Sequence, residues 1–407
     1  MSRFKIHYAW VILISCFMCC FSYGVFYTFG VFLRHLQLEF GWGRGLASTI
    51  HSLHWVFFPI SSLIVGRLTD RYGPKLPLAG GGILIGLGIS LLSTVQNITQ
   101  FYLFYSLASL GSGIIWALPT ATVQRWFAKF RGLSIGIVAS GVGMCYVLSP
   151  ASSLLIAGIG WRASYLVLGT GTCLILLAAS LLIVSCPEKM GLEPYGAMQD
   201  GPTSGVPGLG EWETTEVMRN RNFWLICGIH ASHLFAVMTL AVHLVIFATD
   251  VGISEVSAAA AWFLVGLCSI AGRIAGGYAG EAIGYKRGFI ICGLANTVML
   301  LWLIQVDSLW MLLVFVPFYG FFYGAETPML PGILGNFFGL RPLATLIGTM
   351  MLTGMLTGTI APFFAGFLYD ALKSYLVPFG TAAAFWAFSA FLAFLLRKPA
   401  KSIEARS

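Results

Sequence analysis

The chain has 407 residues, of which 58% are hydrophobic and 9% are charged, and its formal net charge is +8. An ordinary soluble domain carries about 25% charged residues, so this chain lacks the polar side chains needed to cover a surface in water. Composition therefore excludes a soluble globular protein and predicts an integral membrane protein.

The first apolar stretch starts at Ala9 and continues to about Leu33 without a charged residue before Arg34. It is too long for the hydrophobic region of a signal peptide, and no small-residue cleavage site follows it. We therefore predict that it forms the first transmembrane helix. The nine cysteines fall in or beside apolar stretches and are odd in number, which argues against a disulfide framework.

Further apolar stretches of helix length recur along the chain, and their continuity excludes the alternating pattern of a transmembrane β-barrel. The predicted spans are 9–33, 46–66, 76–94, 101–124, 133–158, 163–185, 223–248, 256–279, 288–305, 309–335, 343–367 and 375–396. A polar segment rich in glycine and proline separates the sixth span from the seventh. The predicted organisation is a six-helix half (1–186), a cytoplasmic linker (187–221), a second six-helix half (222–397) and a cytoplasmic tail (398–407).

Basic residues are distributed unequally between the two sets of loops. With both termini in the cytoplasm, the outer side receives only four basic residues: Arg34, Arg44, Arg162 and Lys373. This asymmetry follows the positive-inside rule and predicts cytoplasmic N- and C-termini. The positive net charge is then a consequence of membrane topology, and we predict no binding to nucleic acid.

Two loop segments share one pattern. "GRLTDRYGPK" begins at Gly66 and "GYAGEAIGYK" begins at Gly277, and each has an acid, a glycine and a lysine at the same offsets. Short matches in other helices recur with nearly the same spacing. The two halves are therefore predicted to be pseudo-symmetric repeats, with a substrate site near the membrane midplane at their interface.

The repeated motif has a mechanical interpretation. One glycine permits close helix approach, another forms a tight turn, and the acids and bases pair at the cytoplasmic helix ends, forming a latch that holds one access state. The alternative is a solvated turn that obeys the positive-inside rule. The predicted gating residues are Gly66, Asp70, Arg71, Gly73, Lys75, Gly277, Glu281, Gly284 and Lys286.

Arg273 lies within an apolar stretch that begins near Ala258. Placing arginine at the centre of a transmembrane helix costs about 2.5–3.5 kcal/mol on insertion scales, so its presence indicates a function. A guanidinium binds a carboxylate through two parallel hydrogen bonds. We predict that Arg273 binds an anionic substrate; the alternative is a structural ion pair with a neighbouring helix.

The loop motif at Gly66 resembles the signature of the major facilitator superfamily between its second and third helices, and the Gly277 copy fills the matching position. "WFAKFRGLSIGIVASG", from Trp126 to Gly141, resembles the fifth-helix signature of the monocarboxylate transporters, with tryptophan in place of tyrosine at Trp126. "PISS" at Pro59 and "SYG" at Ser22 are also similar to that family. The resemblance implies an all-α membrane protein of twelve transmembrane helices in two six-helix halves. Oxalate/formate antiporters share much of this pattern.

The resemblance implies that Arg273 forms a salt bridge with the substrate carboxylate. Two family residues connected with proton coupling are absent, because Tyr27 replaces a lysine and Ser269 replaces an aspartate. Asp250 and Glu326 are then the candidate proton carriers. Glu326 and Arg273 lie about 25 Å along their helices from the predicted outer ends, which predicts direct pairing when the site is empty. Alternatively, Asp250 is a solvated helix-end acid and Glu326 anchors Arg273.

A small carboxylate needs one cation, one or two hydrogen-bond donors and apolar walls. Side chains on helices that face the cavity in this fold supply the remaining predicted substrate contacts: Tyr27, His54, Trp116, Tyr146 and Tyr323. His51, one turn from His54, is a weaker candidate. For each aromatic residue taken singly, packing or lipid contact is the alternative.

Two other functional classes are an intramembrane enzyme and a non-transporting sensor. His230 and His233 have the spacing of two metal ligands on one helix face, but no acid accompanies them as in HExxH, and no hydrolase constellation is present. An intramembrane enzyme and a non-transporting sensor are therefore disfavoured. We predict no metal, no cofactor and no enzymatic activity.

The sequence predicts a secondary active transporter of small monocarboxylates similar to L-lactate or pyruvate, coupled to protons by alternating access. The alternative is an organic-anion exchanger of the oxalate/formate type. The predicted partners are the monocarboxylate anion, the proton and the lipid bilayer, with no obligate protein partner. The predicted location is the inner (cytoplasmic) membrane of a bacterial cell, as a multi-pass protein.

Overall fold

The computed structural model describes residues 7–41, 44–197 and 212–399. The side chains of Arg34, residues 44–52, Tyr146 and Val147 are outside the described part. Parts of the predicted linker (198–211) and tail (400–407), and the side chains of His51 and Tyr146, therefore cannot be compared with the structure. Within the described ranges the chain is helical, with an isolated β-bridge between Phe127 and Tyr195.

The chain forms two compact units, each containing a short segment distant from the rest in sequence. Unit one comprises the described parts of 1–129, 138–199 and 344–349, and unit two those of 130–137, 200–343 and 350–407. The predicted boundaries at 186, 221 and 397 stay predictions.

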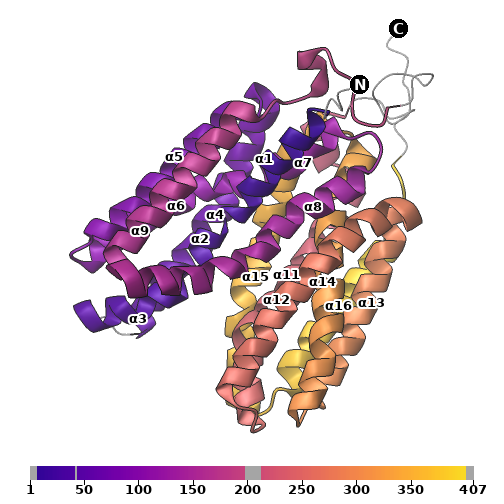
Figure 1. Ribbon diagram of the computed structural model, residues 1–407. Helices are drawn as coiled ribbons and strands as arrows, with labels where there is room; N and C mark the ends of the chain where they lie inside the picture. Colours follow the sequence, from indigo (N-terminus) through magenta and orange to yellow (C-terminus); the bar gives the residue numbers. More distant parts are fainter. Residues whose placement is uncertain (1–6, 42–43, 198–211, 400–407) are drawn as a thin grey trace, which may run out of the picture. The chain divides into compact units, whose positions relative to one another are not determined.

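Unit one is built mainly from the first half of the chain (Figure 1). Its helices are α1 (Ala9–Phe21), α2 (Gly24–Tyr27), α3 (Phe29–Phe40), α4 (Arg44–Tyr72), α5 (Lys75–Leu91), η1 (Leu92–Thr94), α6 (Ile98–Gly111), η2 (Ser112–Ile115), α7 (Ala117–Trp126), the end of α8 (Arg131–Gly143), η3 (Met144–Val147), α9 (Leu148–Leu182) and η4 (Pro187–Met190). Helix α5 packs against α6 and α9, and α4 packs against α6. Gly160, at φ +77°, interrupts α9 where the sequence predicts a turn between two spans.

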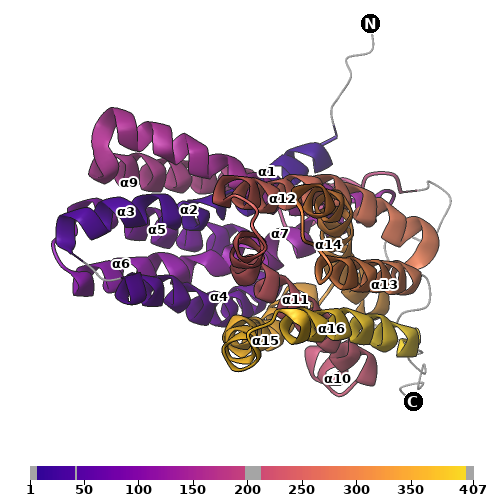
Figure 2. The ribbon, with the colours of Figure 1, turned by 90° about the horizontal axis from the view of Figure 1, so that it is seen from below.

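Unit two contains most of the second half. Its helices are α10 (Thr214–Met218), α11 (Arg221–Asp250), α12 (Glu255–Ala279), the π-helical η5 (Gly280–Gly284), α13 (Tyr285–Leu303), α14 (Leu309–Phe338), most of α15 (Leu343–Leu372) and α16 (Leu376–Leu395). Helix α12 packs along α14, α13 along α14 and α16, and α11 along α16 (Figures 1 and 2). A Cβ atom on Gly276 of α12 would collide with the backbone of Ala325, so glycine permits the close α12–α14 contact.

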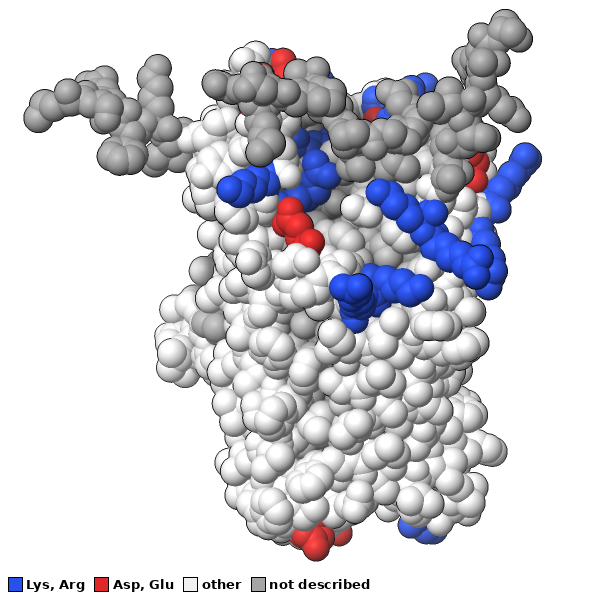
Figure 3. Space-filling model, turned by 90° about the vertical axis from the view of Figure 1, so that its right-hand side faces the viewer, with Lys and Arg blue, Asp and Glu red and all other residues white. Residues whose placement is uncertain are grey.

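The lengths of the helices agree with the predicted crossings. Among the described residues, 9 stretches are long and apolar enough to span a membrane. Two of them, Arg131–Leu182 and Glu255–Leu303, contain 52 and 49 residues, enough for two crossings each because one crossing needs about 20. Helix α4, with 29 residues, supplies a further crossing. On the face drawn in Figure 3, charged side chains gather towards the ends and the wide band between them lacks charge.

Candidate functional site

The first copy of the loop motif forms a tight contact with the start of α15 inside unit one. Asp70 accepts hydrogen bonds from the backbone N–H groups of Thr345 (2.7 Å) and Ala344 (3.4 Å), and it pairs with Arg125 at 2.9 Å. A carboxylate at a helix N-terminus satisfies N–H groups that have no partner within the helix and interacts favourably with the helix dipole.

Two glycines of this copy have the geometry that the sequence predicts. A Cβ atom on Gly66 would collide with the carbonyl group of Ala344, and Gly73 has a φ of +87°, which side chains rarely tolerate. Arg71 lies over the ring of Tyr72, with 5.1 Å from its Cζ atom to the ring centroid. Lys75 begins α5 and is exposed.

The second copy repeats this arrangement inside unit two. Glu281 accepts a hydrogen bond of 3.0 Å from the backbone N–H of Gly132, in the first turn of α8. A Cβ atom on Gly277 would collide with the carbonyl oxygen of Gly132, and Gly284 has a φ of +91°. Lys286 donates to the carbonyl oxygen of Leu396 at 3.0 Å. In both copies the motif acid therefore contacts the N-terminus of a helix distant in sequence.

Asp70 lies outside the predicted membrane span 46–66. The pKa of its carboxyl group changes when Asp70 contacts the start of α15. Burial is the largest influence and raises the pKa of Asp70, whereas the bonds from Thr345 and the charge of Arg125 act to lower it. A raised pKa means that the contacted state holds the proton more tightly than a state with Asp70 in water. The contact is therefore favoured at pH values below this pKa and becomes less favoured as the pH rises through it.

The second group of polar residues surrounds Arg273 on α12. Its side chain is 3% exposed, and its two terminal nitrogens donate to the hydroxyl oxygens of Ser269 (2.6 Å) and Tyr323 (3.2 Å). The Cζ atom lies 5.4 Å from the centroid of the Tyr323 ring. Within the described residues the Nε atom has no hydrogen-bond partner. The partners that hold this cation are thus neutral hydroxyl groups.

Glu326 on α14 is fully buried and has different neighbours. Its Oε2 atom lies 3.6 Å from Nδ1 of His233 on α11, and its Oε1 atom accepts a long hydrogen bond of 3.4 Å from Ser389 on α16. The described residues contain no ion pair between Glu326 and Arg273, which differs from the pairing expected in an empty site. The physical reason is that neutral hydroxyl groups on α12 and α14 already hold Arg273.

Asp250 ends α11 and is exposed. Its Oδ2 atom accepts a hydrogen bond of 3.2 Å from the hydroxyl group of Tyr369. It is therefore in the position of a helix-end acid at the surface of unit two, whereas Glu326 lies within that unit.

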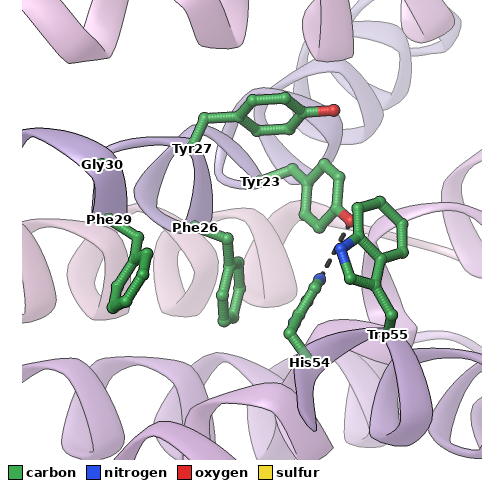
Figure 4. Close-up of a pocket in the computed structure, with 7 residues that line it drawn as sticks. All are labelled: Tyr23, Phe26, Tyr27, Phe29, Gly30, His54 and Trp55. Atoms are coloured by element: carbon green, nitrogen blue, oxygen red, sulfur yellow. Dashed lines mark hydrogen bonds between the residues drawn. The ribbon is translucent and has the colours of Figure 1, made fainter. Parts of the chain in front are cut away.

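Unit one contains an aromatic cavity of about 220 Å³ (Figure 4). The side chains of α2, α3 and α4 and the residues beside them enclose it: Tyr23, Phe26, Tyr27, Phe29, Gly30, His54 and Trp55. The Tyr23 hydroxyl lies 2.9 Å from Nε2 of His54, and the opposite ring nitrogen lies 3.2 Å from the Ser109 hydroxyl. The predicted residues Tyr27 and His54 thus share one cavity, and Tyr23 completes it.

Of the other predicted substrate contacts, Trp116 and Tyr323 do not line the aromatic cavity. Trp116 is buried at the start of α7, and within the described residues its indole nitrogen has no hydrogen-bond partner. Tyr146 lies on η3, and its side chain is outside the described part. Tyr323 is joined to Arg273 as described above. Tyr27, His54 and Trp116 belong to unit one, whereas Arg273 and Tyr323 belong to unit two.

Three residues of these sites were not predicted as site residues from the sequence. Tyr23 lies in the "SYG" segment, but no pattern in the sequence places its hydroxyl on His54. The sequence suggests only a metal-ligand spacing for His233 with His230, and Ser389 carries no sequence signal. The described residues contain no group of three or more His, Cys, Asp or Glu side chains that could hold a metal ion.

Long apolar helices, a buried arginine within one of them and acids that contact helix N-termini are features of a multi-pass membrane transporter. The chain belongs to the Major Facilitator Superfamily, whose family model matches residues 15–279 and 226–407.

Relatives and solved structures agree with this assignment. The chain is 28% identical over 390 residues to monocarboxylate transporter 13 of Bos taurus, covering 93% of this chain and 87% of that one. It is 25% identical over 296 residues to the oxalate:formate antiporter of Oxalobacter formigenes, covering 72% and 68%. The fold is similar to that of the E. coli fucose:proton symporter, with a TM-score of 0.73 at 14% identity over 95% of this chain and 99% of that one.

These comparisons confirm the predicted fold class, an all-α membrane protein with the twelve-helix major facilitator fold. They also confirm the resemblance to monocarboxylate transporters as homology. The chain is a multi-pass membrane transporter and not an enzyme.

Proposed function

We propose that this protein is a secondary active transporter that moves small monocarboxylates, similar to L-lactate or pyruvate, together with a proton. The observation that carries the proposal is the environment of Arg273, a buried guanidinium held by the hydroxyl groups of Ser269 and Tyr323. A buried cation is costly unless an anion neutralises it. A substrate carboxylate supplies that charge, and the planar fork of arginine matches its two oxygens.

The size of the aromatic cavity supports a small organic ligand. Its volume of about 220 Å³ is below the roughly 300–1,000 Å³ of pockets for drug-sized ligands. Tyr27 and His54 are proposed as substrate contacts in these largely apolar walls, and Trp116 and Tyr146 are proposed as further contacts. The proposed partners are the monocarboxylate, the proton and the bilayer of the inner (cytoplasmic) membrane, without an obligate protein partner.

The two motif copies are proposed to control access to the site. Asp70 and Glu281 each hold the N-terminus of a distant helix, and such contacts form in one conformation and break in another. In each copy, the glycines and basic residues of the motif are proposed to act together with the acid in holding this contact. Transport then proceeds by alternating access, and Asp250 and Glu326 are the candidate proton carriers.

Exchange of organic anions is the second candidate. Tyr27 and Ser269 stand where the monocarboxylate transporter family has a lysine and an aspartate connected with proton coupling. The similarity to an oxalate:formate antiporter also supports this alternative. In an obligate exchanger, the binding site reorients across the membrane only with a counter-substrate bound, so the protein needs no proton carrier.

Uptake of labelled L-lactate into proteoliposomes separates the two candidates. A proton symporter accumulates lactate when only an inward pH gradient is imposed on vesicles that contain no anion. An obligate exchanger takes up label only when lactate, oxalate or formate is loaded inside. Protein carrying Arg273→Ala is the negative control, and lack of both kinds of uptake by the unmodified protein would refute the proposed function.

A further inference from the structure

The buried contact between Glu326 and His233 belongs neither to the arginine site nor to the motif latches. Glu326 is 0% exposed and His233 is 4% exposed, and their facing atoms, Oε2 and Nδ1, are 3.6 Å apart. This distance is too long for a good hydrogen bond, and neither atom has another hydrogen-bond partner among the described residues. The contact is therefore a buried pair of titratable groups that is incompletely satisfied.

Several helices place polar or titratable groups near the pair. Helix α11 also carries His230, whose ring lies 6.3 Å from that of His233. Helix α16 supplies the Ser389 hydroxyl, and the Cys292 thiol of α13 is close enough to Glu326 to interact with its charge. Arg273 of α12 approaches the pair through Tyr323, and no described atom of another lysine, arginine or acid contacts it.

Tyr323 joins the pair to the arginine site. Its hydroxyl accepts a hydrogen bond from Arg273, and its ring lies 5.6 Å from the ring of His233. Glu326 follows Tyr323 by three residues on α14, so both side chains lie on one face of that helix. One aromatic side chain therefore contacts both the proposed anion site and the buried pair.

We infer that Glu326 and His233 together form the proton-binding site of transport, with Ser389 orienting the carboxyl group and Tyr323 linking proton binding to the anion site. This inference rests on the proposed function. The proton enters from water and forms an N–H bond on His233 or an O–H bond on Glu326. It leaves to water on the opposite side, and no electron is transferred.

Charge balance explains how the pair couples proton to substrate. In the empty carrier, Arg273 is positive, the Glu326 carboxylate is negative and His233 is neutral, so the buried charges sum to zero. With one carboxylate and one proton bound, the substrate neutralises Arg273 and the proton neutralises the pair. Binding either alone leaves a net charge in a medium of low dielectric constant, which opposes reorientation. The fully loaded and empty carriers are therefore the states that reorient.

The test compares two kinds of uptake in proteoliposomes containing the full chain: lactate–lactate exchange and accumulation driven by an imposed pH gradient. We expect Glu326→Gln and His233→Gln to retain most of the exchange and to lose accumulation by about tenfold or more, within the usual range of coupling factors. Asp370→Asn is the matched control, because Asp370 is an exposed acid of the same unit, paired with Lys373. We expect this control to behave as the unmodified protein.

Milder variants keep the inference testable if either glutamine substitution prevents folding. We expect Ser389→Ala, which removes one bond to the Glu326 carboxylate, to shift the pH of half-maximal accumulation while exchange persists, and Glu326→Asp to restore part of the accumulation. Normal accumulation by Glu326→Gln or His233→Gln, or an unshifted pH profile in Ser389→Ala, would overturn the inference. So would loss of accumulation confined to Asp250→Asn. Absence of both uptake modes in the unmodified protein would instead refute the proposed function.

Discussion

At the scale of single residues, Arg273 is a buried cation whose described hydrogen-bond partners are neutral hydroxyl groups. Ser269 and Tyr323 fix the guanidinium through two hydrogen bonds without neutralising it. A carboxylate partner in the same position would neutralise the charge and compete with substrate.

We expect Arg273→Ala to weaken lactate binding by at least about 2 kcal/mol, or roughly 30-fold, because it removes one partner of a buried charge pair. Arg273→Lys should restore only part of this affinity, since an ammonium group lacks the planar pair of donors. Isothermal titration of detergent-solubilised protein with L-lactate measures both effects. Lactate affinity that survives in folded Arg273→Ala protein would place the substrate elsewhere.

At the scale of helices, each motif copy forms a close contact with a helix that is distant in sequence. Each places a glycine against the backbone of a distant helix and an acid against that helix's N-terminus. Gly66 contacts Ala344 of α15, and Gly277 contacts Gly132 of α8. The close backbone approach brings the acid within hydrogen-bond distance of the N–H groups.

We expect Gly66→Ala to destabilise the contacted state by about 1–3 kcal/mol, because the added methyl group would overlap a backbone carbonyl that cannot move easily. Gly80→Ala is the matched control, since Gly80 is an exposed glycine of α5 with no atom within 4 Å of the added Cβ position. That control should be neutral or stabilising by up to about 1 kcal/mol. Thermal unfolding of the two variants in the same detergent gives the comparison. Equal melting temperatures would indicate that the Gly66 contact is loose.

Asp70→Asn and, separately, Glu281→Gln should slow lactate transport several-fold while changing lactate affinity less than about twofold. The acids bias a conformational equilibrium and do not contact the anion, and a ligand's affinity changes only through differential binding to the two states. Initial transport rates and equilibrium binding should be measured on the same preparations, with the exposed Glu188→Gln as control. Equal losses in rate and affinity would assign these acids a role in binding.

At the scale of the whole molecule, the helices could be predicted well because a membrane span is encoded locally, in about 20 consecutive apolar residues. Arg273 was also predictable, since a charge inside such a span is conspicuous. The neighbours of Glu326 were not. His233 and Ser389 come from two other helices, and nothing in their local sequence indicates that they contact Glu326.

The predicted topology can be tested by accessibility. Asp307 and Lys189 are both exposed, and the positive-inside rule places them on opposite sides of the membrane. In a Cys186→Ser background, an impermeant thiol reagent added to intact cells should label Asp307→Cys but should label Lys189→Cys only after permeabilisation. The reverse pattern would invert the topology.

The composition of unit one also limits how early in synthesis that unit can be completed. Residues 344–349 complete that unit, although nearly all its other residues are synthesised much earlier. The nascent chain therefore contains Asp70 long before it contains Ala344 and Thr345, whose N–H groups donate to the Asp70 carboxylate. A chain truncated before α15 leaves this acid and the Gly66 surface uncovered. The contact is thus absent from every such truncated chain, and only a chain that extends through Thr345 can form it.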